Sequence, residues 1–246
     1  MKRIIIAACL LTWLTTETKA QETVTTTVST PAANPGGLYI RGGVNFANIS
    51  ISDNGSVNNA NALTTFNAGF IADIPASNYF SVQTGLLLNG QGAKATTYAD
   101  NSNTSDNFVT SKFNPLYLQL PVNLVLKLPV ANDTRLFIGA GPYVQMGIGG
   151  TAKTTSQFAG VASSNSYDIK FDNDDPTTSQ EEGASNDRLK RFDIGMNALA
   201  GIESGSVMVG LNYGLGFTKI NSTETNSNAN DANKYRTFSI NVGFKF

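Results

Sequence analysis

The last twelve residues of the chain, YRTFSINVGFKF (235–246), alternate between two kinds of side chain with a period of two. From position 238 onward the even positions are apolar, and the odd positions are polar or small. This alternation predicts a β-strand with one apolar and one polar face. In a soluble sandwich the apolar face would be buried in a core. In an outer-membrane barrel it would meet lipid, and the polar face would line the lumen.

Seven further segments show the same period, which gives eight predicted strands. Their bounds are 38–49, 62–74, 79–91, 113–127, 134–149, 189–203, 206–219 and 235–246. The short connections are 75–78, 128–133 and 204–205, and the long ones are 50–61, 92–112, 150–188 and 220–234. Short turns at one rim and long loops at the other are typical of outer-membrane barrels. We therefore expect an all-β fold, an eight-stranded antiparallel up-and-down transmembrane β-barrel.

Strand parity assigns each side chain to lipid or to the lumen. Two bands of outward phenylalanines are expected at the membrane interfaces, and a polar network is expected inside the barrel. The expected lipid-facing girdle comprises Phe46, Phe66, Phe80, Phe192, Phe217, Phe238, Phe244 and Phe246. The expected lumen network comprises Arg41, Asp73, Gln83, Gln119, Asn123, Lys127, Gln145, Asp193 and Lys245. The alternative, in which the aromatic residues fill a sandwich core, explains neither these bands nor the alternation of loop lengths.

The N-terminal segment predicts export. A basic start, an apolar run and the sequence Thr18-Lys-Ala20 indicate a secretory signal peptide over 1–20, and a Thr-rich periplasmic tether over 21–37 leads into the barrel domain, 38–246. Cys9, the one cysteine, follows a lipobox-like Ile6-Ala-Ala8, so a lipoprotein is the alternative. No apolar stretch is long enough for a transmembrane helix. Charged residues make up only 14% of the chain, and no basic patch suggests nucleic-acid binding.

Several strands resemble those of a known family. The segment FNPLYLQLPVNLVLK (113–127) resembles the signature strand of the PorT-like outer-membrane β-barrel family of the Bacteroidota, and RGGVNFANI (41–49), FSVQTGLLLNGQGAK (80–94) and GAGPY (139–143) resemble three of its other strands. The resemblance covers about 38–246 and implies an outer-membrane barrel of this size. Some members of the family are linked to secretion or gliding machinery, but most have no assigned activity. No functional residue is carried over from it.

The prolines of the predicted strands are unusual, because a central strand tolerates proline poorly. Pro115, Pro121 and Pro142 are therefore expected at bulges or rims.

The chain lacks several of the residue types that enzymes commonly use for catalysis. It contains no histidine, which excludes Ser-His-Asp hydrolysis and histidine-based acid catalysis, so no catalytic residue and no cofactor are predicted. Asp73 and Asp193 would serve as paired carboxylates only if they met. The expectation is instead that they form lumen ion pairs with Arg41, Lys127, Arg191 or Lys245.

The long segment 150–188 is acidic. Within it Asp172, Asp174 and Asp175 are candidate calcium ligands, although the spacing of a calcium-binding loop is absent and a solvated acidic loop is the favoured interpretation.

Eight strands enclose an interior that side chains can fill. We therefore expect a structural or partner-binding barrel in the cell outer membrane, with extracellular long loops and periplasmic termini, accessory to a secretion or uptake complex. The alternatives are a narrow channel and, least favoured, a lipid-modifying enzyme. The expected partners are outer-membrane lipid, the barrel-assembly machinery through the C-terminal strand, and other envelope proteins through the loops.

Overall fold

The computed structural model describes residues 34–50, 61–98, 107–171, 188–220 and 233–246. The predicted signal peptide, most of the predicted tether and the calcium candidates Asp172, Asp174 and Asp175 lie outside these residues. The last residues of the predicted tether, 34–37, are among the described residues. Asn34 is buried, and Gly37 already belongs to the first strand.

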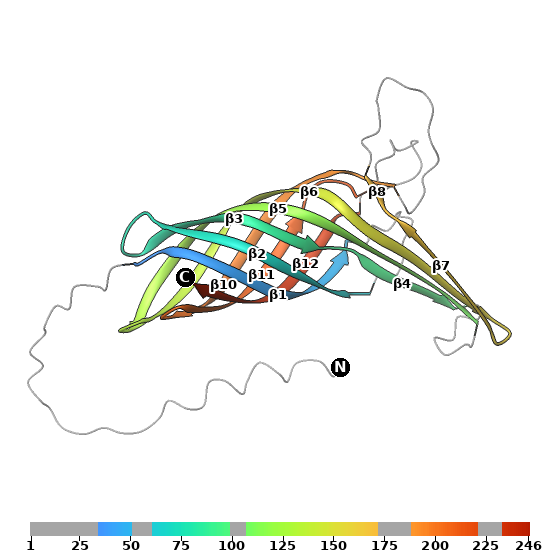
Figure 1. The fold of residues 1–246 in the computed structure, drawn as a ribbon, viewed down its shortest axis with the longest axis horizontal. Helices are drawn as coiled ribbons and strands as arrows, with labels where there is room; N and C mark the ends of the chain where they lie inside the picture. Colours follow the sequence, from blue (N-terminus) through green and yellow to red (C-terminus); the bar gives the residue numbers. More distant parts are fainter. Residues whose placement is uncertain (1–33, 51–60, 99–106, 172–187, 221–232) are drawn as a thin grey trace, which may run out of the picture. The chain divides into compact units, whose positions relative to one another are not determined.

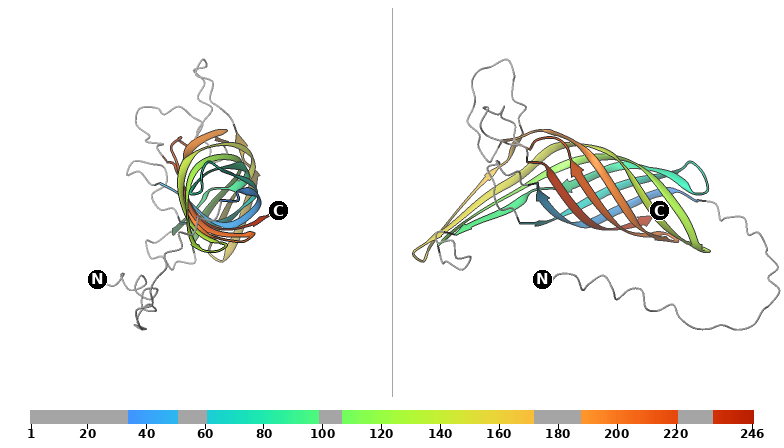
Figure 2. Two further views of the ribbon diagram at one scale, coloured as in Figure 1. Left: turned by 90° about the vertical axis from the view of Figure 1, so that its left-hand side faces the viewer. Right: turned by 180° about the vertical axis from the view of Figure 1, so that it is seen from behind.

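Eight strands form a closed ring (Figures 1 and 2). They are β1 (Gly37–Ile49), β2 (Leu63–Pro75), β3 (Phe80–Gly90), β5 (Phe108–Ala131), β6 (Thr134–Phe158), β10 (Phe192–Ser204), β11 (Val207–Gly216) and β12 (Tyr235–Lys245). Each strand pairs antiparallel with the next one in this order, and β12 pairs with β1 to close the ring. The predicted all-β, up-and-down eight-stranded barrel is confirmed.

One rim carries the short connections. The turns there span 76–79, 132–133 and 205–206. Gly37 of β1 pairs with Asp73 at the end of β2, and the amide of Phe246 donates to the carbonyl of Leu38 at 3.1 Å. The start of the barrel and the end of the chain therefore lie at the short-turn rim. Figure 1 shows the marked C-terminus near the β2–β3 turn.

The opposite rim departs from the predicted irregular loops. Segments 92–112 and 150–188 contain the strands β4 (Ala93–Tyr98) and β7 (Val161–Asp168), together with the first residues of β5 and the last residues of β6. These pair in the order β4-β5-β6-β7 and form a four-stranded sheet that continues beyond the barrel wall (Figure 1). Two further short strands, β8 (Lys170–Phe171) and β9 (Arg188–Leu189), pair in parallel. The prediction of loops was wrong because threonine favours strands without producing an apolar alternation.

The burial of the wall follows the predicted parity. In β12 the polar residues from Thr237 to Asn241 are buried, whereas the apolar residues between them are exposed. An exposed apolar face suits lipid, where backbone groups must be satisfied by neighbouring strands. The closed ring provides those neighbours for every strand of the wall.

The prolines are accommodated by openings in the strand ladder. Pro115 lies one residue before a register shift between Leu116 and Tyr117, which matches the expected bulge. Pro121 is fully buried in mid-strand, so the expectation of a bulge or rim is wrong there. The ladder around it is interrupted on both sides. Towards β3 it skips the pairs formed by residues 120 and 121, and towards β6 it skips those of 122 and 123, opposite Pro142. A strand with paired neighbours on both sides thus tolerates the missing amide.

Candidate functional site: a filled lumen and an extended sheet

The lumen near the short-turn rim is crossed by buried ions. The Lys127 ammonium on β5 forms ion pairs with Asp73 on β2 and, at 2.6 Å, with Glu203 on β10. The Tyr39 hydroxyl on β1 donates to the other oxygen of Glu203 at 2.9 Å. Strands β2 and β10 lie on opposite sides of the ring, so this cluster spans the full width of the barrel.

Amide side chains cross the lumen at a second level. Asn67 donates to Asn45 at 2.6 Å, and Asn45 donates to Asn89 at 2.7 Å. Asn89 in turn donates to Gln119 at 3.2 Å and to Gln145 at 3.4 Å. This chain of hydrogen bonds connects β2, β1, β3, β5 and β6. Because each amide both donates and accepts, such a chain orders the interior at little desolvation cost.

Asp193 ends this chain on β10 but does not form the expected ion pair. Among the described residues its carboxylate accepts hydrogen bonds from uncharged partners, namely Gln145 at 2.9 Å, Tyr143 at 3.1 Å and the Thr218 amide at 3.4 Å. Asp73, by contrast, pairs with Lys127 in the ion cluster near the short-turn rim. The two aspartates therefore belong to different networks and do not form a carboxylate pair.

An apolar layer closes the lumen near the long-loop rim. Tyr117 on β5 and Tyr235 on β12 come from opposite sides of the ring, and their hydroxyls lie 3.2 Å apart. Their rings meet edge to face, with centroids 5.6 Å apart, and Phe171 packs against Tyr117 in the same manner. The buried members of this layer are Ile49, Ala93, Tyr117, Ala152, Ile169, Leu189, Ile220 and Tyr235.

The other expected lumen residues are placed less centrally in these networks. Gln83 and Asn123 are buried inside the barrel, and each has one side-chain polar atom without a protein partner. Arg41 lines two small cavities. Lys245 is half-buried at the short-turn rim. Arg191, a possible partner of the aspartates, is exposed and donates to the carbonyl of Phe171 at 3.0 Å.

Glu203, Tyr39 and Tyr235 are network members that the sequence analysis did not name. Glu203 shares the inward parity of Asp193 on the same strand, so extending the parity by ten residues would have identified it. Tyr39 is the third residue of β1 and Tyr235 is the first residue of β12, and both share the odd, inward parity of their strands, so parity would have identified them too.

The expected girdle residues lie on the outer face. All eight phenylalanines are exposed, and Phe46 stacks on its cross-strand partner Phe238 with ring centroids 6.3 Å apart. Among the described residues no helix is long and apolar enough to span a membrane.

The sheet beyond the rim presents a different surface. Every residue of β7 is exposed, and three of its eight residues are serines. Hydroxyl pairs supplement the backbone ladders of this sheet, such as Thr96 with Thr110 at 3.0 Å. At its tip Phe158 and Val161 face each other across a two-residue turn, and both are exposed. Over the described ranges, no cluster of three or more histidine, cysteine, aspartate or glutamate residues could hold a metal ion.

Comparison with known proteins identifies the family. Residues 34–222, more than half of the chain, match the family described as outer membrane protein beta-barrel domain. The chain therefore belongs to this family, and it is an outer-membrane β-barrel.

Solved structures of similar proteins were also found. The attachment invasion locus protein Ail of Yersinia pestis is 14% identical with a TM-score of 0.39, over 86% of this chain and 99% of that one. The Neisserial surface protein A is 12% identical with a TM-score of 0.40, over 85% of this chain and 97% of that one. No curated protein matches the chain.

Proposed function

We propose that this outer-membrane barrel is a non-conducting scaffold that binds an extended protein segment at the outer edge of β7. One observation supports this proposal above all. The lumen is crossed at three levels, while a four-stranded sheet with an open edge continues beyond one rim. A barrel whose interior is filled by side chains has no open lumen for transport. Its function is then expected in the segments that extend beyond the wall.

The edge of β7 has the chemistry of a strand-addition site. Along its whole length β7 pairs with β6, and no other described strand pairs with it. The edge of β4 is less open, because Lys94 forms a bridge with Asn61. An unpaired edge offers a row of backbone donors and acceptors to an incoming strand, and its exposed side chains then select the partner. The exposed Phe158 and Val161 add an apolar contact at the end of that row.

The proposal includes an orientation and an assembly route. The β4–β7 sheet would lie outside the cell, and the short turns and both mature termini would lie in the periplasm, where short turns of such barrels are found. The girdle contacts lipid, and the C-terminal strand β12 engages the barrel-assembly machinery. Membership in the PorT-like group, with an accessory role in secretion or uptake, is part of the same proposal and rests on the strand resemblance alone.

The proposal assigns the protein no enzymatic activity. A lipid-modifying role is the least favoured alternative because the chain contains no histidine for acyl chemistry. A narrow channel is the main alternative, and it differs from the scaffold in a property that can be measured directly.

Strand addition can be tested with neighbouring proline variants. Ser163 and Ser164 are adjacent on β7, so the amide of one faces β6 and the amide of the other faces the open edge. We expect that proline at the open-edge position leaves the hairpin intact but removes a photo-crosslinked adduct formed from a probe at Asn165. Proline at the other position should disturb the hairpin itself. A probe at Asp133 in a short turn is the control. Crosslinking that survives both proline variants, or that occurs only from Asp133, would contradict the proposal.

A further inference from the structure

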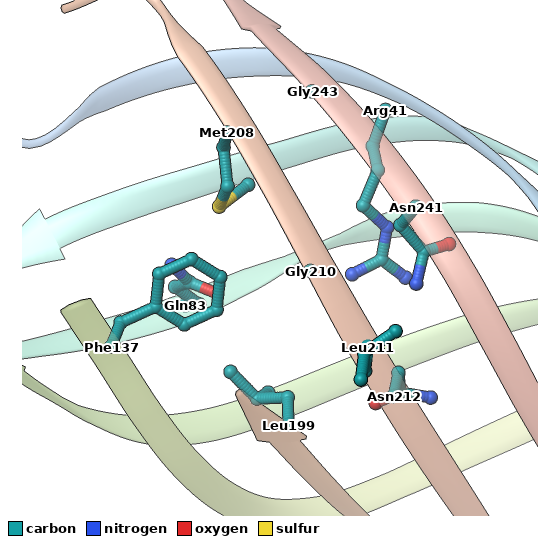
Figure 3. A pocket seen from close by; sticks show the side chains of 10 residues that line it. All are labelled: Arg41, Gln83, Phe137, Leu199, Met208, Gly210, Leu211, Asn212, Asn241 and Gly243. Carbon is teal, nitrogen blue, oxygen red and sulfur yellow. The ribbon is translucent and has the colours of Figure 1, made fainter. Parts of the chain in front are cut away.

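Arg41, a half-buried arginine with a buried Nε atom, lies at mid-barrel without a partner among the described residues. Arg41 on β1 is paired with Gly243 of β12 on one side and with Gly69 of β2 on the other. Because neither neighbour has a side chain, the guanidinium has room to extend into the lumen. Figure 3 shows it beside Asn241, reaching towards the level of Gly210.

The positive charge of Arg41 has no counter-charge among the described residues. Neither an ion pair nor a hydrogen bond joins its guanidinium to another described side chain, and its Nε atom is buried without a partner. The other lumen cations differ in this respect. Lys127 holds two carboxylates, and Arg135 faces Glu203 directly across the strand pair.

Such a charge is costly. Arginine cannot lose its proton in a protein, so it cannot become neutral. An isolated buried ion costs several kcal/mol after relaxation, and buried charges are therefore paired or bound to ions of opposite sign. A water molecule satisfies donors but does not neutralise the charge.

A small cavity adjoins the guanidinium. Its volume is about 20 Å³, and its polar lining includes Arg41, Gln83 and Asn241. The Gln83 Nε2 donor has no protein partner, and neither has the Asn241 Oδ1 atom. The two amide ends of an asparagine are nearly indistinguishable, so a half-turn of Asn241 directs its NH₂ group to the cavity. Phe137, Leu199 and Met208 supply apolar walls. A second cavity of about 10 Å³ lies on another side of Arg41, beside Asn67 and Asn197.

We propose that the cavity beside Arg41 binds one small monovalent anion of the halide class, such as chloride. The charge of Arg41 and the free donors of Arg41 and Gln83 recognise the ion. The volume sets its size, because a single water already needs about 10–15 Å³, which leaves no space for phosphate or a carboxylate. The apolar side chains and the amides that line the cavity hold the ion inside the folded barrel. The ion therefore stabilises the structure and does not pass through the lumen.

Bromide replaces chloride and can be located by anomalous scattering. Crystals of the full chain grown in sodium bromide should show an anomalous peak within hydrogen-bond distance of the Arg41 guanidinium. Crystals of the Arg41→Met variant should lack that peak, while peaks at the protein surface remain. Ordered water without an anomalous peak at this position in the wild-type crystal would overturn the proposal.

A solution measurement separates a true site from an ion bound only at crystal concentration. The urea midpoint of the barrel in lipid vesicles should rise with the logarithm of the sodium chloride concentration above the dissociation constant, relative to sodium gluconate at equal ionic strength. The Gln83→Leu variant keeps Arg41 and removes one donor, and it should weaken the apparent chloride affinity about tenfold, which corresponds to about 1.4 kcal/mol. The exposed Arg191→Met variant is the control and should respond like the wild type. Equal midpoints in chloride and gluconate at every concentration would overturn the proposal.

Discussion

Strands β5 and β6 pass through two regions of the molecule, the barrel wall and the β4–β7 sheet. Both regions are hydrogen-bonded sheets, but their outward side chains differ. In the barrel wall their outward side chains are apolar, as in Leu120 and Val144, which lie opposite each other and are both exposed. Further along, in the β4–β7 sheet, the exposed positions of the same two strands include Lys112 and Lys153, which are also paired. The change of outward side chains along this one strand pair indicates where lipid contact ends.

The two regions also differ in what lies behind them. The wall encloses ions, amides and an apolar layer that connect opposite strands, whereas the sheet is a single layer with an open edge. A sheet without a packed core contributes little stability of its own. We therefore expect the barrel to determine the free energy of unfolding, and substitutions in the sheet to change it very little. The predictions below test that contrast.

The largest expected difference is between two lysines of β5. Lys127→Met leaves Asp73 and Glu203 buried without their cation, which should lower the free energy of unfolding by about 3–5 kcal/mol. Lys112→Met, in the exposed sheet, should change it by less than about 0.5 kcal/mol. Urea titration in lipid vesicles measures both. Similar losses for the two variants would mean that the sheet is part of the stable core.

A second contrast concerns the lipid face. Leu120→Arg places a charge on the outer wall and should cost about 2–4 kcal/mol near the bilayer midplane. Thr151→Arg, exposed on β6 beyond the wall, should cost almost nothing, because it meets water. The inward Asn123→Ser should also cost far less than Leu120→Arg. Equal costs at Leu120 and Thr151 in vesicle refolding would remove the proposed boundary between the regions.

The smallest expected effect lies at the tip of the sheet. Ala159 has a φ of 48° in the turn before Gly160, whose φ is 79°. Asparagine adopts this left-handed conformation more readily than alanine does, and Asn-Gly is the preferred pair for such a hairpin turn. Ala159→Asn should slow amide exchange in β7 while leaving the urea midpoint of the barrel unchanged. A raised midpoint would show that the hairpin and the barrel unfold together.

The sequence predicted the barrel because lipid imposes a simple alternation on the wall. Each outward position such as Leu120 must be apolar, and each inward one such as Gln119 is free to be polar, so parity alone distinguishes them. The β4–β7 sheet was missed because most of its residues are exposed or half-buried on both faces. Nothing then forces Thr154 to differ from Lys153, and the period-two signal disappears.

The interior was predicted by type of residue but not by contact. Parity placed Lys127 and Asp73 inside, yet it could not show that Lys127 also reaches past β6 to Glu203 or that Asp193 accepts hydrogen bonds from uncharged donors. Those contacts depend on the register of β6 against β5 and β10, which no single strand encodes. The absence of a side chain beside Arg41 could not be predicted from its own strand either, because it depends on glycines of the two neighbouring strands.

Conductance across a planar lipid bilayer distinguishes a filled lumen from an open one. Purified wild-type protein should show no steady current at moderate salt, because ion pairs, amides and the Tyr117–Tyr235 contact each span the lumen. Tyr117→Ala opens only the outermost level and should remain closed, as should Gln119→Ala. A reproducible open state of the wild type, enlarged by Tyr117→Ala, would contradict the account and establish a narrow channel instead.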